Sequence, residues 1–313
     1  MTAKQNRLDL SPILAKPKAG SHTKLFCSQI ANNPLDKGLL NVQILNDAKH
    51  AIASLSGASL SYTVRNTDRS VGAMLSGAIA QVHGNQGMHD DPIQIQLSGT
   101  VGQSFGVWNA GGLEMHLVGD ANDYVGKGMT GGKLVISNPT NISFDPHVSA
   151  IMGNTCLYGA TGGKLFAAGR AGERFGVRNS GAVAVVEGTG DNACEYMTGG
   201  IVAVLGAVGV NFGAGMTGGF AYILDELDDI EHRINPELVE IMGIGDKVIL
   251  SEHLRGLINQ HYEETGSEFA MGLLNNFNEV LPKFRLIKPK TSNVKNLLGH
   301  ISRSSAELAI QAQ

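Results

Sequence analysis

The 313-residue chain lacks the features of a membrane, nucleic-acid-binding or secreted protein. No window approaches the roughly 20 apolar residues that a membrane-spanning helix needs. The formal net charge is only −4, and no run of Lys and Arg forms a basic stripe that would bind nucleic acid. Cys27, Cys156 and Cys194 are odd in number and far apart, which is typical of free thiols in a reducing compartment. The first residues also lack the apolar core of a signal peptide, so we expect a cytoplasmic protein.

Aromatic residues are scarce too, at 5% of the chain, and Trp108 is the sole tryptophan. Glycine, by contrast, occurs 41 times, about twice its ordinary frequency of roughly 7%. The glycines do not fall at every third position, which excludes a collagen helix. Disorder is also excluded, because 42% of the residues are hydrophobic and the net charge is small. The glycines therefore require a structural explanation.

Pairs of glycines mark an internal repeat. Four segments are nearly superimposable and two are looser copies: 128–137, 159–168, 196–205 and 215–224, with 108–117 and 178–187. The first glycine of each pair lies at position 111, 131, 162, 181, 199 or 218, which gives steps of 20, 31, 19, 18 and 19 residues. The long step contains residues 138–147, whose Pro, Asn and Asp indicate an inserted loop. Residues 99–112 also align with 169–182 at an offset of 70, which indicates duplication of a larger block.

This repeat predicts an all-β fold, a parallel β-helix of about seven turns over residues 56–226. Each glycine pair precedes a short run of Val, Ile, Leu, Ala or Phe that is typical of a strand. The first glycine of the pair is expected to have positive φ and so to permit a corner. A period near 19 residues leaves no room for a helix and a strand in each repeat, so βαβ units are disfavoured.

The flanks differ from the repeat. Residues 1–55 are predicted to form a linker and a helical lead-in, because residues 33–55 have helical apolar spacing. Residues 227–313 are predicted to form a helical segment and a tail that starts near Pro289. Ser251 and Ser267 are expected to cap two helices, the second ending at Pro282. Their apolar faces would contain Leu254, Leu257, Ile258 and Tyr262 in the first helix, and Phe269, Leu273, Phe277 and Leu281 in the second. We expect such elements to cover the open end of the coil.

Several motifs suggest enzyme chemistry but fit the repeat better. Residues 126–131 and 213–218 both match G-x-G-x-x-G, yet they lead into strands, whereas a dinucleotide site needs a following helix. Residues 102–106 match the G-x-S-x-G nucleophile elbow around Ser104. The equivalent residue of the second block is Arg174, which cannot be a nucleophile. A corner of the coil is therefore the preferred interpretation of all three.

Possible metal ligands and recognition residues occur in the corners and in one loop. His83, His89, Asp90 and Asp91 lie in a glycine-rich loop that we interpret as solvated, with a metal site as the alternative, because no second cluster completes a coordination sphere. The cysteine spacing does not support iron–sulfur ligation. Polar residues at 65–69, 120–123 and 170–174 either satisfy turn backbone or recognise a partner. No catalytic, cofactor-binding or metal-binding residue is predicted.

Longer motifs resemble one family closely. They are residues 64–77, 102–112, 119–133, 153–182, 194–200 and 209–226. This set is similar to the GXGXG domain of glutamate synthase, and more narrowly to the C-terminal domain of the bacterial NADPH-type large subunit. The resemblance runs nearly end to end, since it includes residues 7–14, 264–270 and 294–313.

The resemblance implies a right-handed β-helix within an enzyme that makes two glutamates from glutamine, 2-oxoglutarate and NADPH. In that family an amidotransferase domain releases ammonia, and a barrel domain with FMN and a 3Fe–4S cluster performs the reduction. The β-helix would brace these two partner domains around the ammonia path and hold no cofactor itself. An NADPH-oxidising small subunit is a further candidate partner. The chain alone is not expected to be catalytic.

Two other functions stay open at this point. The chain could be a free-standing GXGXG interaction subunit of another amidotransferase or oxidoreductase complex. It could also be an autonomous flavoenzyme, although the residues give that reading little support. The sequence leaves open whether the chain is a separate subunit or a piece of a longer polypeptide.

Overall fold

The computed structural model describes residues 7–16, 18, 20–31, 37–140 and 142–293. It divides into two compact units, residues 1–37 and 38–313. The first unit contains one short helix, α1 (Ser11–Leu14), in its described part. All other elements belong to the second unit. Within the described ranges, every helix is too short or too polar to cross a lipid bilayer.

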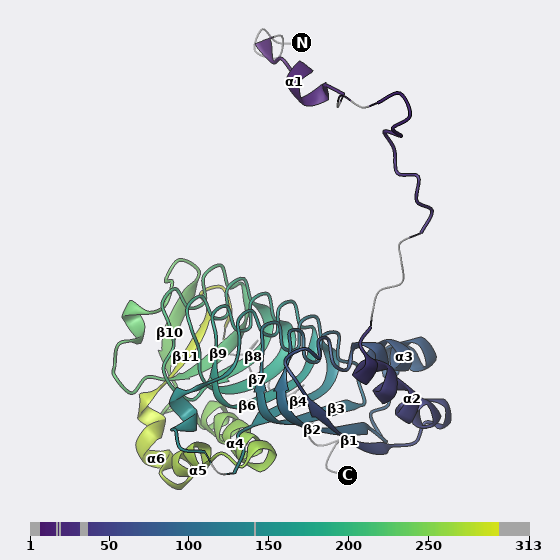
Figure 1. Ribbon diagram of the computed structural model, residues 1–313. Coiled ribbons are helices and arrows are strands. Elements are labelled where there is room, and N and C mark those ends of the chain that lie inside the picture. The colour runs from purple at the N-terminus through teal and green to yellow at the C-terminus, as the bar shows by residue number, and fades with distance from the viewer. Residues whose placement is uncertain (1–6, 17, 19, 32–36, 141, 294–313) are drawn as a thin grey trace. The chain divides into compact units, whose positions relative to one another are not determined.

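The second unit is a β-helix of about six turns, hereafter called rungs (Figure 1). The strands that wind the coil pair in parallel with their neighbours in chain order, and only the short β5 (Ala150–Met152) lies outside that order, pairing in parallel with β3 and β6. The others are β1 (Ala58–Val64), β2 (Ile93–Val101), β3 (Leu113–Ala121), β4 (Thr130–Ser137), β6 (Gly162–Ala171), β7 (Ser180–Gly188), β8 (Thr198–Val204) and β9 (Gly218–Leu224). The predicted parallel β-helix is thus confirmed. It has about six turns rather than seven, because the winding after β1 passes through a helix.

Apolar columns fill the interior of the coil. Strand register places one side chain of each rung directly above the next, and every member of one such column is at most 2% exposed. The column consists of Leu97, Leu117, Ile136, Ala167, Val186, Val204 and Ile223. The inserted loop predicted at 138–147 is present and includes the 3₁₀ helix η3 (Pro146–Val148). It leaves the column intact, because β4 pairs directly with β6 across it.

The side of the coil opposite the sheet contains no strands and is built from left-handed residues. In each rung, three residues at positions i, i+2 and i+4 have positive φ: 104, 106 and 108; 124, 126 and 128; 155, 157 and 159; 174, 176 and 178; 192, 194 and 196; 211, 213 and 215. In the first five triplets, the outer two N–H groups donate to the following rung and the middle one donates backwards. Ser104 and Trp108, for example, donate to the carbonyl oxygens of Asp123 and Lys127, and Gly106 donates to that of Val71.

The glycine pairs act differently from the prediction. Positive φ occurs at the second glycine of a pair, such as Gly132 (φ +69°) and Gly219 (φ +71°), and not at Gly131 or Gly218. The first glycine is required by space instead, because a Cβ on Gly218 would lie 2.1 Å from the carbonyl oxygen of Thr198. The pair therefore combines close approach of two rungs with a left-handed corner.

Both ends of the coil are closed. Helices α2 (Leu39–Ser54) and α3 (Ala73–His83), followed by the 3₁₀ helix η2 (Gly84–Gln86), cover the β1 end (Figure 1). Their buried Ile44, Leu75 and Ile79 join the interior core. The lead-in helix was predicted, whereas α3 was not. At the other end, β11 (Phe284–Pro289) pairs antiparallel with β9 and with β10 (Val239–Gly243), next to the 3₁₀ helix η4 (Ile230–His232).

The C-terminal helices cover the outer face of the sheet rather than its open end (Figure 1). They are α4 (Val248–Thr265), α5 (Glu268–Asn275), α6 (Phe277–Val280) and the 3₁₀ helix η5 (Leu281–Lys283). With the outward side chains of β4 and β6–β9 they form a second core that includes Phe166, Phe220 and Leu254. The second predicted helix is broken at Asn276, and the first already begins at Val248.

A buried polar cluster fastens these helices to the sheet. Glu187 projects outward from β7, and its Oε1 accepts hydrogen bonds from His261 Nε2 at 3.1 Å and from Ser267 Oγ. The three side chains are at most 8% exposed. Ser267 Oγ also accepts a hydrogen bond from Ala270 N at 3.1 Å, which confirms it as the cap of α5. The predicted cap Ser251 is wrong, because it lies inside α4 and its hydroxyl donates to Val248 O.

Two further contacts lie on either side of the Glu187 cluster. Lys133 of β4 forms ion pairs with Glu264 of α4 at 2.8 Å and with Glu114 of β3 at 3.4 Å. Phe269 stacks on His147 of the inserted loop, with ring centroids 4.4 Å apart. Glu264, Ser267 and Phe269 thus attach the helices to strands β4 and β7 and to the loop.

The glycine arrangement predicts that Gly218→Ala lowers the free energy of unfolding by about 1–3 kcal/mol, because its Cβ must push two rungs apart. The matched control is Gly256→Ala in α4, where an added Cβ meets nothing within 4 Å. It should raise stability by roughly 0.5–1 kcal/mol through helix propensity. Denaturant unfolding of both variants measures the difference, and equal effects would contradict the close-approach argument.

The two serines provide a second pair. Ser267→Ala should cost about 2–3 kcal/mol, because it removes a helix cap and a hydrogen bond to a buried carboxylate. Ser251→Ala, within an exposed helical turn, should change stability by less than about 0.5 kcal/mol. Urea denaturation checks both. A Ser267→Ala variant as stable as Ser251→Ala would show that the cluster does not hold the helices.

His253 of α4 predicts a pH dependence. Its Nδ1 lies 3.0 Å from Tyr222 Oη, and burial lowers the pKa of the imidazole from 6.5 to about 4. Between about pH 4 and pH 6.5, the imidazole is therefore protonated in the unfolded chain and neutral in the folded chain. Stability should fall as the pH drops from about 6.5 towards 4, by at most about 3 kcal/mol from this group. Unfolding curves of wild type and His253→Phe across this range test it, since the variant should lose that part of the slope.

Candidate functional site

The motifs that resemble catalytic sites lie in corners of the coil. Ser104 has φ +67° and its equivalent Arg174 has φ +59°, so both occupy the first left-handed position of a rung. The G-x-G-x-x-G motifs at 126–131 and 213–218 lead into strands β4 and β9 and not into helices. None of the three therefore has the strand–turn–helix geometry that a nucleophile elbow or a dinucleotide site requires.

The loop with the candidate metal ligands does not gather them around one point. His83 Nε2 lies 2.7 Å from the carbonyl oxygen of Ile52, and the ring of His89 lies against Gly111. Nowhere in the described ranges do three or more His, Cys, Asp or Glu side chains lie close enough together to hold a metal ion. Cys156 and Cys194 are fully buried in the turn side. Burial raises the pKa of both thiols, that of Cys156 to about 12, so they lack the thiolate character of a nucleophile.

The polar corners mainly satisfy turn backbone. Asp68 Oδ2 accepts a hydrogen bond from Arg65 N at 2.8 Å, and Asp123 Oδ1 accepts one from Asn154 N at 2.7 Å. Arg174 forms an ion pair with Glu195 of the next rung at 3.0 Å while its side chain stays half exposed. The turn-forming interpretation is therefore confirmed for Asp68 and Asp123, and Arg174 also presents charge to solvent.

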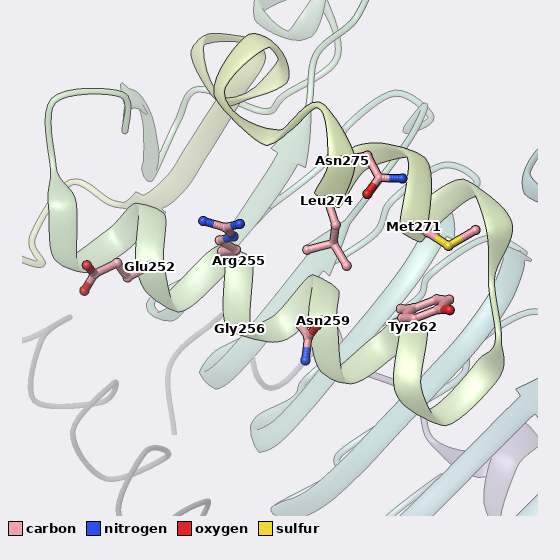
Figure 2. Close-up of a pocket in the computed structure, with 8 residues that line it drawn as sticks. All are labelled: Glu252, Arg255, Gly256, Asn259, Tyr262, Met271, Leu274 and Asn275. Carbon is pink, nitrogen blue, oxygen red and sulfur yellow. The ribbon is translucent and has the colours of Figure 1, made fainter.

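One open hollow lies between α4 and α5, with a volume of about 610 Å³ (Figure 2). Eight residues line it: Glu252, Arg255, Gly256, Asn259, Tyr262, Met271, Leu274 and Asn275. They include no thiol and no imidazole, and the guanidinium of Arg255 lies 5.5 Å from the ring centre of Phe277. The hollow therefore has the character of a shallow binding surface and not of a reaction centre.

A second surface feature stands out on the turn side. We call it the aromatic ridge, and it consists of Trp108, Tyr124, Lys127, Tyr158, Arg178 and Tyr196. Its members follow one another over five successive rungs. The Nζ atom of Lys127 lies 5.2 Å from the ring centre of Tyr124 and 5.7 Å from that of Tyr158. The side chains of Trp108 and Tyr196 are 63% and 51% exposed.

Three ridge residues occupy a position that other rungs give to glycine. Trp108, Arg178 and Tyr196 hold the third left-handed site, with φ of +55°, +54° and +53°. The same site is glycine in the other three rungs, at 128, 159 and 215. A side chain in this conformation costs roughly 1 kcal/mol. The rings of Trp108 and Tyr196 lie against Gly128 and Gly215 of the following rungs, where an added Cβ would be 2.9 and 2.4 Å from the nearest ring atom.

Sequence reasoning missed this ridge, although a signal was present. Alignment of the repeats places Trp108, Arg178 and Tyr196 in one column with three glycines. Because glycine is sufficient at this site in three rungs, the fold does not require a large side chain in the other three.

Comparison with known proteins agrees with the geometry. A family model described as "GXGXG motif" matches residues 41–290. A ferredoxin-dependent glutamate synthase 2 of Synechocystis is 49% identical over 257 residues, which are 82% of this chain and 16% of the relative. The NADPH glutamate synthase large chain of Azospirillum brasilense is 44% identical over 283 residues, 90% of this chain and 18% of the relative. The NADH glutamate synthase of Schizosaccharomyces pombe is 41% identical over 292 residues, which are 92% of this chain and 14% of the relative.

The chain spans less than a fifth of the length of these relatives. Their names include ferredoxin-, NADPH- and NADH-dependent enzymes, so the similarity does not single out the NADPH type. The resemblance to the glutamate synthase GXGXG domain is nonetheless confirmed. The chain belongs to the GXGXG family, whose model matches most of its length.

Proposed function

We propose that this chain is a structural domain of a cytoplasmic glutamate synthase. In this role it braces the amidotransferase and FMN-binding synthase domains around the ammonia path and supplies no reacting group. One observation carries the proposal: the relatives that match nearly the whole chain are glutamate synthases five to seven times longer than the match. The remaining length is where we place the catalytic domains, FMN and the 3Fe–4S cluster.

The physical character of the coil supports a bracing role. Eight parallel strands share one hydrogen-bonded sheet, and the turn side is joined by a second set of backbone hydrogen bonds. Six rungs spaced by about 4.8 Å extend about 29 Å along the coil axis. Because both sides of each rung are bonded to the next, the coil resists bending and can hold two domains at a set distance.

The use of the polar side chains also supports the proposal. Glu187, His261 and Ser267 contain the groups of a hydrolytic triad, yet they lie buried between helix and sheet. Serine and histidine both bond to the carboxylate, whereas a triad needs the serine to bond to the histidine. These groups stabilise the fold, and we assign the chemistry to other domains.

Complementation tests the proposal. The remainder of the large chain, expressed without this domain, should form glutamate from added ammonia but much less from glutamine, because the ammonia path is no longer enclosed. Adding the present chain should restore glutamine-dependent synthesis with reduced ferredoxin or NADPH and the small subunit as electron source. The ratio of glutamine- to ammonia-dependent rates is the measurement.

Ammonia-dependent activity of the remainder alone is the control that it is folded. The absence of both a complex and rescue would overturn the proposal. A stable complex with an unrelated amidotransferase or oxidoreductase, together with no rescue, would instead support a free-standing GXGXG interaction subunit.

A further inference from the structure

We propose that the aromatic ridge is the surface through which the coil docks onto another domain of the glutamate synthase chain. The inference rests on the proposed function and adds to it the face that makes the contact. The ridge residues, as defined above, extend over five successive rungs of the turn side.

The fold does not need the large side chains of the ridge. Trp108, Arg178 and Tyr196 have left-handed backbone at a site where three other rungs have glycine. Glycine adopts this conformation without strain, so each large residue lowers the stability of the coil. Trp108 and Tyr196 contact glycines of the following rungs, but more than half of each side chain stays exposed, at 63% and 51%. Their side chains therefore serve contacts that the chain does not make with itself.

The other apolar faces of the coil are already covered within the chain. Helices α4–α6 cover the outer face of β4 and β6–β9, and α2 and α3 close the β1 end. Strands β10 and β11 extend the sheet beyond β9. The outer face of β2 remains open, but it presents Gln94, Gln96 and Ser98, which are well solvated. The turn side is thus the exposed face with a continuous group of aromatic side chains.

The chemistry of the ridge specifies its occupant. Trp, Tyr and Arg dominate the binding energy of protein interfaces. Lys127 lies over two ridge rings, and Arg178 forms no ion pair with any described carboxylate. Because the ridge combines exposed rings at Trp108 and Tyr196 with the positive charges of Lys127 and Arg178, we expect a folded domain that offers an apolar pocket with carboxylates at its rim. Nucleic acid is disfavoured, since Asp123, Glu173 and Asp191 lie in the adjoining corners.

The repeat itself supplies the test variant. Combining Trp108→Gly, Arg178→Gly and Tyr196→Gly places glycine at the third left-handed site of all six rungs and changes no other residue. The melting temperature should be kept or raised, because strain is relieved. Binding to the remainder of the large chain should weaken by about tenfold or more. Leu227→Ser, which alters an apolar side chain 75% exposed outside the ridge, is the control and should bind like wild type.

Trp108 is the sole tryptophan and gives a direct readout in the unmodified chain. Its fluorescence should shift to shorter wavelength, and its quenching by acrylamide should fall, when the remainder of the large chain is added. A complex that forms with unshifted emission would overturn the inference. A shift that depends only on the concentration of this chain would assign the ridge to a second copy and would overturn it too.

The outcomes separate the two proposals. If wild type and the triple variant bind and rescue equally, the ridge is not the docking surface, but the structural role stands. If the wild type neither binds nor rescues, the proposed function falls and the inference falls with it. A lower melting temperature of the triple variant would overturn the strain argument.

Discussion

Backbone hydrogen bonds between rungs on the strand-free side are the constraint on which the rest of the coil depends. A chain that turns without forming strands would leave its N–H groups without partners between closely stacked rungs. Left-handed residues at every second position provide these partners, because the N–H groups of the three left-handed residues point alternately to the following and the preceding rung. Gly126, Leu157 and Gly176 all donate backwards in this way.

This constraint explains the unusual composition. Each rung needs several positions where positive φ or close approach favours glycine, and the repeat therefore accumulates glycines. It also explains how one rung accepts an insertion. The long step leaves after β4 and returns through β5, so Thr155, Leu157 and Gly159 resume the left-handed triplet in register. The bonds of the turn side thus continue across a repeat of 31 residues as across one of 19.

The sequence was sufficient for what is periodic and local. Repeat spacing, strands, the inserted loop and the cap at Ser267 could all be predicted, because each has a nearby pattern. The position of α4 could not be predicted from the sequence. Its stripe of Leu250, Leu254 and Ile258 shows that something covers it but not which surface. Glu187 bonds to residues 74 and 80 positions away, a distance at which no local pattern operates.

Errors arose where two physical causes favour the same residue. Glycine serves both positive φ and close approach, so the sequence alone could not show that Gly218 meets a carbonyl while Gly219 turns the chain. Helix α3 was missed because the whole range 56–226 was assigned to the coil. The two glycines of a pair differ in which atoms of the neighbouring rung they meet, and only the folded chain brings those atoms together.

The aromatic ridge illustrates how a repeat reveals what its fold does not require. A competing explanation is that the rings of Trp108 and Tyr196 shield the turn backbone from water and so stabilise it. The coil contains its own control, because the rungs with Gly128, Gly159 and Gly215 make the same turn without a side chain there. Shielding is therefore not a condition of the turn, and the rings remain more than half exposed while they cover it. An interface that buries the two rings would remove from water the apolar surface that the isolated coil leaves exposed.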